Sequence, residues 1–126
     1  MSFGACTLVI YFDIILISIM KDFLSYLSNK LLIPRSPKWG TVRKQFLIDN
    51  GNICACCSRT KDLNVHHIIP VHIDPSLELE KSNLIILCEK PCHLFCGHLG
   101  SWEAYNPIVI EDARIWNEKI KMRLYN

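Results

Sequence analysis

The chain has 126 residues and a formal net charge of +2, and seven of its residues are cysteines. This length leaves room for one modest domain with appendages, which excludes a large multidomain enzyme. The cysteines are odd in number and six of them fall into two clusters, which argues against a disulfide framework and favours the reducing cytoplasm. A domain this small often depends on a bound metal for its stability.

Residues 1–33 form a hydrophobic N-terminal segment that differs from the rest of the chain. Residues 7–20 are apolar except for Asp13 and hydroxyl side chains. The run is marginal for a membrane span of about 20 residues, and Asp13 near its centre would cost about 2.5–3.5 kcal/mol on insertion. Three interpretations stay open: a weak membrane anchor, a packed helix, or an upstream extension that the natural protein lacks, with Met20 as the start. We favour the last two and a cytoplasmic protein; membrane association through residues 7–20 is the alternative.

The rest of the chain predicts a small α+β domain followed by a terminal helix. Apolar periodicity, capping residues, and glycine and proline breaks place its elements. In chain order they are a helix over residues 42–49 capped by Thr41, a strand over 63–69, a loop over 71–82, a strand over 84–87, a helix from Pro91 that ends at Gly97 or Gly100, and a helix over 107–123. The domain is therefore expected over residues 34–106 and the terminal helix over 107–126.

Basic residues concentrate in residues 30–61, where seven lysines and arginines accompany one acidic residue, Asp49. Such a basic segment beside a metal site is typical of a protein with a polyanionic partner. The alternative is an ordinary solvated surface.

Two cysteine motifs predict a structural zinc site. Cys54-x2-Cys57 and Cys88-x3-Cys92 lie about thirty residues apart and together supply four thiolates, which suits tetrahedral zinc. Four protein ligands leave no open position for water or substrate, so this site is structural rather than catalytic. The second motif has one spacer residue more than is usual. Cys56 and Cys96 are therefore alternatives to Cys57 and Cys92.

Three histidines are placed where they could act together. His66 and His67 are neighbours in the first predicted strand, so their side chains point to opposite faces. One can then bind a metal while the other faces a substrate. His93 follows Cys92 directly, so the zinc site would fix the backbone that presents His93.

These motifs resemble the HNH endonuclease family, and the zinc-containing, phage-associated branch is the most similar. The resemblance rests on Val-His-His-Ile-Ile-Pro at 65–70, Ser-Asn-Leu-Ile-Ile-Leu-Cys at 82–88 and Cys-His at 92–93, and it extends over about residues 34–106. It implies a ββα-metal finger, in which a two-stranded antiparallel ribbon with a long loop and a helix clasp one divalent ion. Here the four-cysteine zinc site would staple that finger, and further helices would flank it.

The resemblance also implies a role for each motif residue. His67 matches the general base that activates water, and His66 matches the metal ligand before it. Asn83 matches the asparagine that ties down the long loop and orients the base, and His93 matches the metal ligand on the helix. His98 is a further possible ligand, but five residues of α-helix rotate it about 500° from His93, so it requires a bulge or a helix end.

The function implied is metal-dependent hydrolysis of DNA phosphodiester bonds, with double-stranded DNA as substrate and with 5′-phosphate and 3′-hydroxyl products. The catalytic ion would be Mg, Mn, Ni or Zn, beside the structural Zn. Arg43, Arg59 and Lys61 are the predicted phosphate-binding residues. Phage packaging or terminase proteins are further partners that the resemblance suggests. The alternative is a non-catalytic zinc module that binds nucleic acid or a protein.

Overall fold

A computed structural model describes residues 14–24 and 34–124 of the chain. The chain divides into two units, Met1–Pro34 and Arg35–Asn126. In the first unit residues 14–24 are helical, while residues 7–13 of the apolar run lie outside the described residues. Among the residues described, no helix combines the length and the apolar character needed to cross a membrane.

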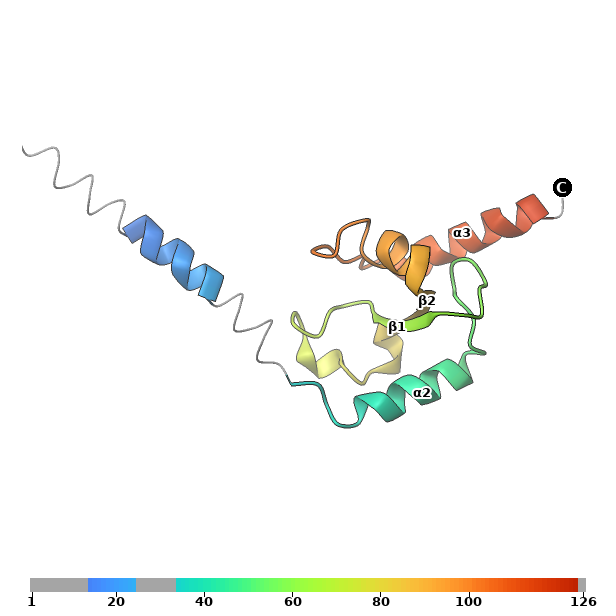
Figure 1. Cartoon of the computed structure of the whole chain (residues 1–126), viewed down its shortest axis with the longest axis horizontal. Coiled ribbons are helices and arrows are strands. Elements are labelled where there is room, and N and C mark those ends of the chain that lie inside the picture. The colour runs from blue at the N-terminus through green and yellow to red at the C-terminus, as the bar shows by residue number, and fades with distance from the viewer. Residues whose placement is uncertain (1–13, 25–33, 125–126) are drawn as a thin grey trace, which may run out of the picture. The chain divides into compact units, whose positions relative to one another are not determined.

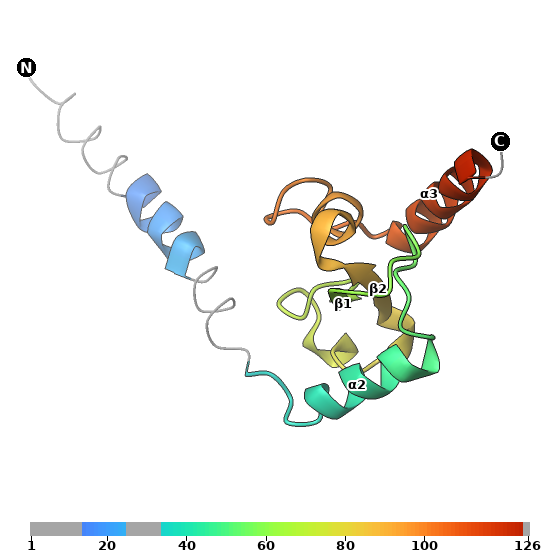
Figure 2. The same cartoon turned by 45° about the vertical axis from the view of Figure 1, so that its right-hand side comes forward.

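The second unit is built on a two-stranded antiparallel ribbon of β1 (Leu63–His67) and β2 (Leu84–Cys88). In this register His66 lies opposite Ile85 and His67 lies opposite Leu84. Helix α2 (Trp39–Asp49) covers one face of the ribbon, and η3 (Glu89–Gly97) and α3 (Val109–Leu124) lie on the other side (Figures 1 and 2). Because side chains alternate between the faces of a strand, the two faces receive different residues.

The face towards α2 forms a small apolar core. Phe46 of α2 packs with Val65 of β1 and with Leu84 and Ile86 of β2. Helix α2 spans Trp39–Asp49, so it begins three residues before the predicted start. The prediction that Thr41 caps this helix is wrong, because the carbonyl of Ser36 accepts the N–H of Trp39 and starts the helical turn earlier.

The other face carries the larger core. Ile85 and Leu87 of β2 pack with Val109 and Ala113 of α3, and buried cysteines complete this cluster. Asn117 of α3 also donates hydrogen bonds to the carbonyl of Cys56, at 3.4 Å, and to the hydroxyl of Ser58, at 2.8 Å, so α3 belongs to the same unit as the ribbon.

The predicted fold class is confirmed: the unit is a small α+β structure with an antiparallel ribbon, flanking helices and four cysteines near one another. Other boundaries also differ from the prediction, since β2 ends at Cys88 and α3 spans Val109–Leu124. β1 ends at His67 rather than at Ile69, because the side chain of Asn83 takes the place of a partner strand beyond that point. The long loop is not irregular throughout, since it contains the short turns η1 (Pro75–Leu77) and η2 (Lys81–Asn83).

Candidate metal centre and catalytic site

Four cysteines converge at the end of the ribbon. The sulfur atoms of Cys54, Cys57, Cys88 and Cys92 all lie within 4.8 Å of one another. The sulfur atoms of Cys57 and Cys88 are 3.7 Å apart. Zn–S bonds of about 2.3 Å in a tetrahedron place two sulfur atoms about 3.8 Å apart, so the four thiols fit a zinc ion.

The extra spacer residue in the second motif is accommodated by the backbone. Lys90 adopts an extended conformation, with φ of −137° and ψ of 130°, between the end of β2 and the helical part of η3. This kink places Cys92 beside Cys88. Cys56 and Cys96, the alternative ligands, lie outside the four-sulfur group and are buried in the adjacent core.

The first cysteine motif is docked tightly on the ribbon. The N–H of Ala55 donates to the carbonyl of Ile86 at 2.9 Å. Burial of the Cys54 sulfur favours the neutral thiol, but backbone N–H groups, that of Cys57 foremost, outweigh burial and lower the pKa of Cys54. Backbone donors that stabilise a thiolate before metal binding favour capture of a cation.

Three histidines converge at a second point on the η3 side of the ribbon. One ring nitrogen from each of His66, His93 and His98 lies within 4.8 Å of the other two. The ring centroids are 5.2 Å apart for His66 and His93, 4.9 Å for His66 and His98, and 5.1 Å for His93 and His98. Since the pairs meet at steep angles of 61–78°, the rings surround a shared point rather than stack.

The shape of η3 explains how His98 reaches this cluster. η3 is a wide helix of the π type, in which hydrogen bonds join residues five apart rather than four, and it ends at Gly97. The wider turn brings positions five apart towards one side, which an α-helix does not do. Glycine at position 97 allows the backbone to lie close to the His66 ring, since a Cβ there would be only 3.1 Å from Cε1 and 3.2 Å from Nε2 of His66.

The protein environment of these rings fits a bound cation. Nδ1 of His98 donates to the carbonyl of Ala104 at 2.7 Å, which leaves Nε2 of that ring with its lone pair. Among the described residues, Nε2 of His66 and Nδ1 of His93 are buried without a hydrogen-bond partner. Burial, followed by the charges of His93 and His98, lowers the pKa of His66 to about 3. A neutral imidazole with an unpaired buried nitrogen is ready to bind a metal.

His67 lies on the α2 face and has a defined tautomer. Its Nε2 is 2.9 Å from the carbonyl oxygen of Glu78, which can only accept, so Nε2 carries the proton and Nδ1 keeps its lone pair. The ring packs against Trp39 with centroids 4.4 Å apart. Burial lowers the pKa of His67, and the hydrogen bond to Glu78 opposes this shift. His67 is therefore held in one orientation, and its lowered pKa favours the neutral imidazole.

Asn83 ties the long loop to the end of β1. Its Oδ1 accepts the N–H of Ile69 at 2.8 Å, and its Nδ2 donates to the carbonyls of Ile69 at 3.0 Å and Leu77 at 3.3 Å. The loop carries Glu78, so Asn83 indirectly fixes the carbonyl that orients His67.

Comparison with known families decides how this arrangement is classified. The family model of the HNH endonuclease matches residues 54–95, which include the four cysteines and His66, His67, Asn83 and His93. This segment is an HNH domain. The domain suggests a nuclease that uses a divalent metal and acts on DNA. No curated protein and no solved structure matches the chain.

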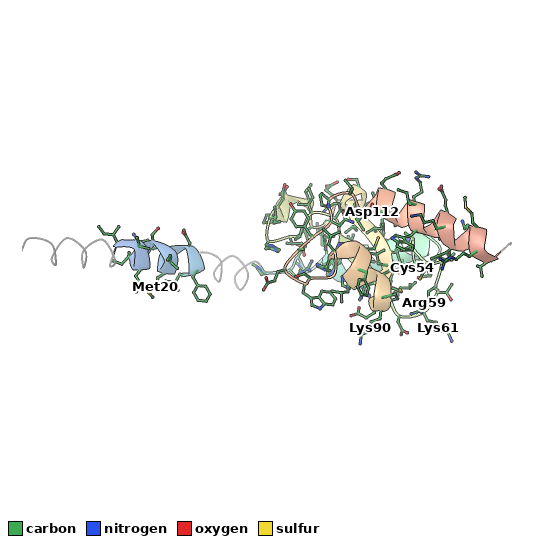
Figure 3. All side chains as sticks on the ribbon, turned by 90° about the horizontal axis from the view of Figure 1, so that it is seen from above. Met20, Cys54, Arg59, Lys61, Lys90 and Asp112 are labelled. Carbon is green, nitrogen blue, oxygen red and sulfur yellow. The ribbon has the colours of Figure 1, made fainter. Side chains whose placement is uncertain are left out.

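The predicted phosphate-binding residues lie at different places around the HNH domain. Arg43 donates to the carbonyl of Leu63 at 3.4 Å, and Arg59 donates to the carbonyl of Lys90 at 2.6 Å. Arg59, Lys61 and Lys90 point outward on the same side in Figure 3.

Arg35 belongs to the predicted basic segment and lies near His67, but it was not one of the three residues singled out for phosphate binding. The guanidinium of Arg35 lies 5.3 Å from the ring centroid of Trp39 and 3.6 Å from the Glu78 carboxylate. Its charge also contributes to lowering the pKa of His67.

Two further residues that sequence reasoning missed follow the matched segment. Asn106 is 2 % exposed, and its side chain donates to the carbonyl of Cys96 at 3.0 Å and accepts the N–H of Ile108 at 3.1 Å. The Trp102 ring lies against His98, with centroids 4.9 Å apart. In residues 98–106 only the residue types of Trp102 and Asn106 could have indicated a role. The residues that they contact are set by the tertiary structure.

Proposed function

We propose that this protein is a metal-dependent HNH endonuclease that hydrolyses DNA phosphodiester bonds. The observation that carries the proposal is the convergence of His66, His93 and His98 on one side of a strand whose next residue, His67, presents a lone pair from the other side. A module that only binds nucleic acid or protein would not need a histidine held in one tautomer next to a three-histidine cluster.

His67 would act as the general base. Nδ1 of His67 would accept a proton from water, the resulting hydroxide would attack phosphorus, and the bond from phosphorus to the 3′ oxygen would break. The products would be a 5′-phosphate and a 3′-hydroxyl, the latter taking its proton from solvent. The carbonyl of Glu78 would keep the proton of the neutral ring on Nε2, so that Nδ1 can accept the proton from water.

His66, His93 and His98 would hold the catalytic ion, which when bound stabilises charge on the phosphate and on the leaving oxygen. Three imidazole nitrogens suit Zn or Ni better than Mg or Mn, which prefer oxygen ligands. The exposed guanidinium of Arg35, beside His67, is placed to bind a backbone phosphate. Cys54, Cys57, Cys88 and Cys92 would hold a separate structural zinc.

The test is plasmid cleavage by the full chain with Mg, Mn, Ni or Zn. We expect nicking with at least one transition metal, and His67→Ala should reduce the rate at least about a hundredfold. His72→Ala is the matched control, because His72 is exposed and lies in the loop that follows β1, and it should retain the wild-type rate. If wild type and His67→Ala are equally inert with every metal, the chain is instead a zinc-binding interaction module.

A further inference from the structure

Residues 98–106, which follow η3, form a loop that is fixed at both ends. Nδ1 of His98 donates to the carbonyl of Ala104 across the loop, and the N–H of Asn106 donates to the carbonyl of Gly97 at 3.0 Å. The buried side chain of Asn106 adds a hydrogen bond to Asp112 at 2.7 Å. In Figures 1 and 2 this loop, in orange, projects from the unit before the chain enters α3. The loop therefore holds its side chains at a defined position beside the histidine cluster.

Trp102 is the side chain that this loop presents at the cluster. Its ring centroid lies 5.3 Å from that of His93 and 4.9 Å from that of His98. One part of the indole thus packs on two of the three clustered histidines. Yet Trp102 is 59 % exposed, so much of the ring remains open to solvent. A large aromatic ring that is fixed on one side and open on the other, next to a reactive site, is suited to stack on a planar ligand.

We propose that Trp102 is a stacking platform for an unpaired base next to the phosphate that is cut, and that the preferred substrate is therefore single-stranded or locally unpaired DNA. This inference rests on the proposed function and names its substrate class. Bases in a duplex are stacked on one another, so their faces reach a protein side chain only where the strand is unpaired. Nucleotides advance about 3.4 Å along a duplex and farther along an unstacked strand, so a ring 4.9 Å from His98 lies close to a nucleotide whose phosphate is held at the histidines.

Binding is measured first, with the full-length His67→Ala protein so that the strand is not cut. The probes are a short oligothymidylate and the same strand paired with its complement, and the readout is quenching of indole fluorescence together with the dissociation constant. We expect the single strand to bind more tightly, and Trp102→Ala to weaken that binding about tenfold while Trp102→Phe recovers part of it. Trp116→Ala is the matched control, because Trp116 is 54 % exposed and belongs to α3, and it should leave the affinity unchanged.

Metal binding separates stacking from support of the histidines. Cobalt titration of the histidine site should give the same affinity in Trp102→Leu as in wild type, because leucine keeps apolar cover on the rings but offers no π face. Equal affinities of Trp102→Ala and wild type for the single strand overturn the inference, as does equal binding of duplex and single strand. A weaker cobalt affinity in Trp102→Leu also overturns it, since Trp102 would then be a supporting residue of the metal site.

The outcomes distinguish this inference from the proposed function. Tight single-strand binding through Trp102 in a protein that cuts nothing sustains Trp102 as a stacking surface and removes the nuclease. Cleavage that proceeds equally on duplex and single strand, and that Trp102→Ala leaves unchanged, sustains the nuclease and removes the inference. If the surface around Trp102 binds a protein and not DNA, the inference that Trp102 stacks on a base is likewise wrong.

Discussion

The cysteine cluster and the histidine cluster are joined through the consecutive residues Cys92 and His93, yet their surroundings differ. Cys54, Cys88 and Cys92 are buried, and the first cysteine motif is hydrogen-bonded to β2 and α3. In the histidine cluster only His66 is buried, whereas His93 and His98 are partly exposed beside an exposed tryptophan. Four thiols, three of them buried, suit a structural metal site, whereas three imidazoles of which two are partly exposed would leave a position for a reactant.

The difference teaches how a unit this small can support a reactive site. The histidine cluster places polar side chains where apolar ones could otherwise pack, so it contributes little to the apolar core. The cysteine cluster can fix the start of η3 without additional apolar packing. With zinc bound to the cysteines, the metal would hold the backbone that presents His93, while His66 comes from a strand paired on one side with β2. Each of the following substitutions alters one cluster, and the measurement shows whether the other cluster still binds its metal.

The largest effect is expected from Cys88→Ser. Cys88 is fully buried, and its sulfur is 3.7 Å from that of Cys57, so serine removes one of four zinc ligands at the end of β2. Because binding of structural zinc supplies much of the folding free energy in such domains, we expect loss of zinc and of the cooperative thermal transition. Wild type with its zinc stripped by a chelator should behave in the same way.

Cys56→Ser is the matched control for this prediction. Cys56 is buried beside the cluster but is not one of the four ligands. It should keep one zinc per cysteine cluster and lose about 1–3 kcal/mol of unfolding free energy, from burial of a hydroxyl. If Cys88→Ser melts at the wild-type temperature with its zinc content intact, the cysteines are not a structural metal site.

The cysteine cluster was the part most readily predicted from sequence, because its ligands lie in two short motifs and their spacing alone restricts the geometry. The ribbon and the opposite orientations of His66 and His67 followed in the same way from strand periodicity. In both cases the relevant partners are local, or are set by a register that the apolar pattern imposes.

The supporting residues could not be predicted, because each acts through a contact distant in sequence. Glu78 orients His67 through a backbone carbonyl, an atom that every residue possesses. Asn106 holds the carbonyl of Cys96, ten residues earlier. From the sequence, the wide turn of η3 could be named only as something that His98 would need in order to reach the other histidines. It could not be predicted, since no residue type specifies a π-type helix. Tertiary packing, rather than local preference, decided these features.

A smaller and more selective effect is expected from Gly97→Ala. The added Cβ would lie 3.1 Å from Cε1 of His66 and 3.2 Å from Cδ1 of Leu87, so the His66 ring must shift. We expect a loss of about 1–3 kcal/mol in unfolding free energy, as for an overpacked core. Displacement of the ligand should weaken cobalt binding at the histidine cluster at least about tenfold. Zinc in the cysteine cluster should be retained.

Gly40→Ala tests whether any added methyl group has this effect. Gly40 lies in α2 and has no atom within 4 Å of its added Cβ, so alanine there should stabilise the helix by up to about 1 kcal/mol. If Gly97→Ala released zinc from the cysteines as readily as it weakened cobalt binding at the histidines, the two clusters would not be independent. The two sites would then respond as one.

The smallest effect is expected from Asn117→Ala, which acts on the cysteine cluster alone. Its Nδ2 bonds to Cys56 and Ser58 connect α3 to the first cysteine motif across about sixty residues of sequence. Loss of a partly buried hydrogen bond should lower the free energy of unfolding in urea by about 1 kcal/mol. Glu118→Ala, which removes an exposed ion pair with Arg114 on the same helix, should change it by less than about 0.5 kcal/mol. Because α3 then makes fewer hydrogen bonds to the first cysteine motif, zinc should dissociate faster from Asn117→Ala in the presence of a chelator. The cobalt affinity of the histidine cluster should stay at the wild-type value. A parallel loss at both clusters would mean that α3 holds the whole ribbon rather than one metal site.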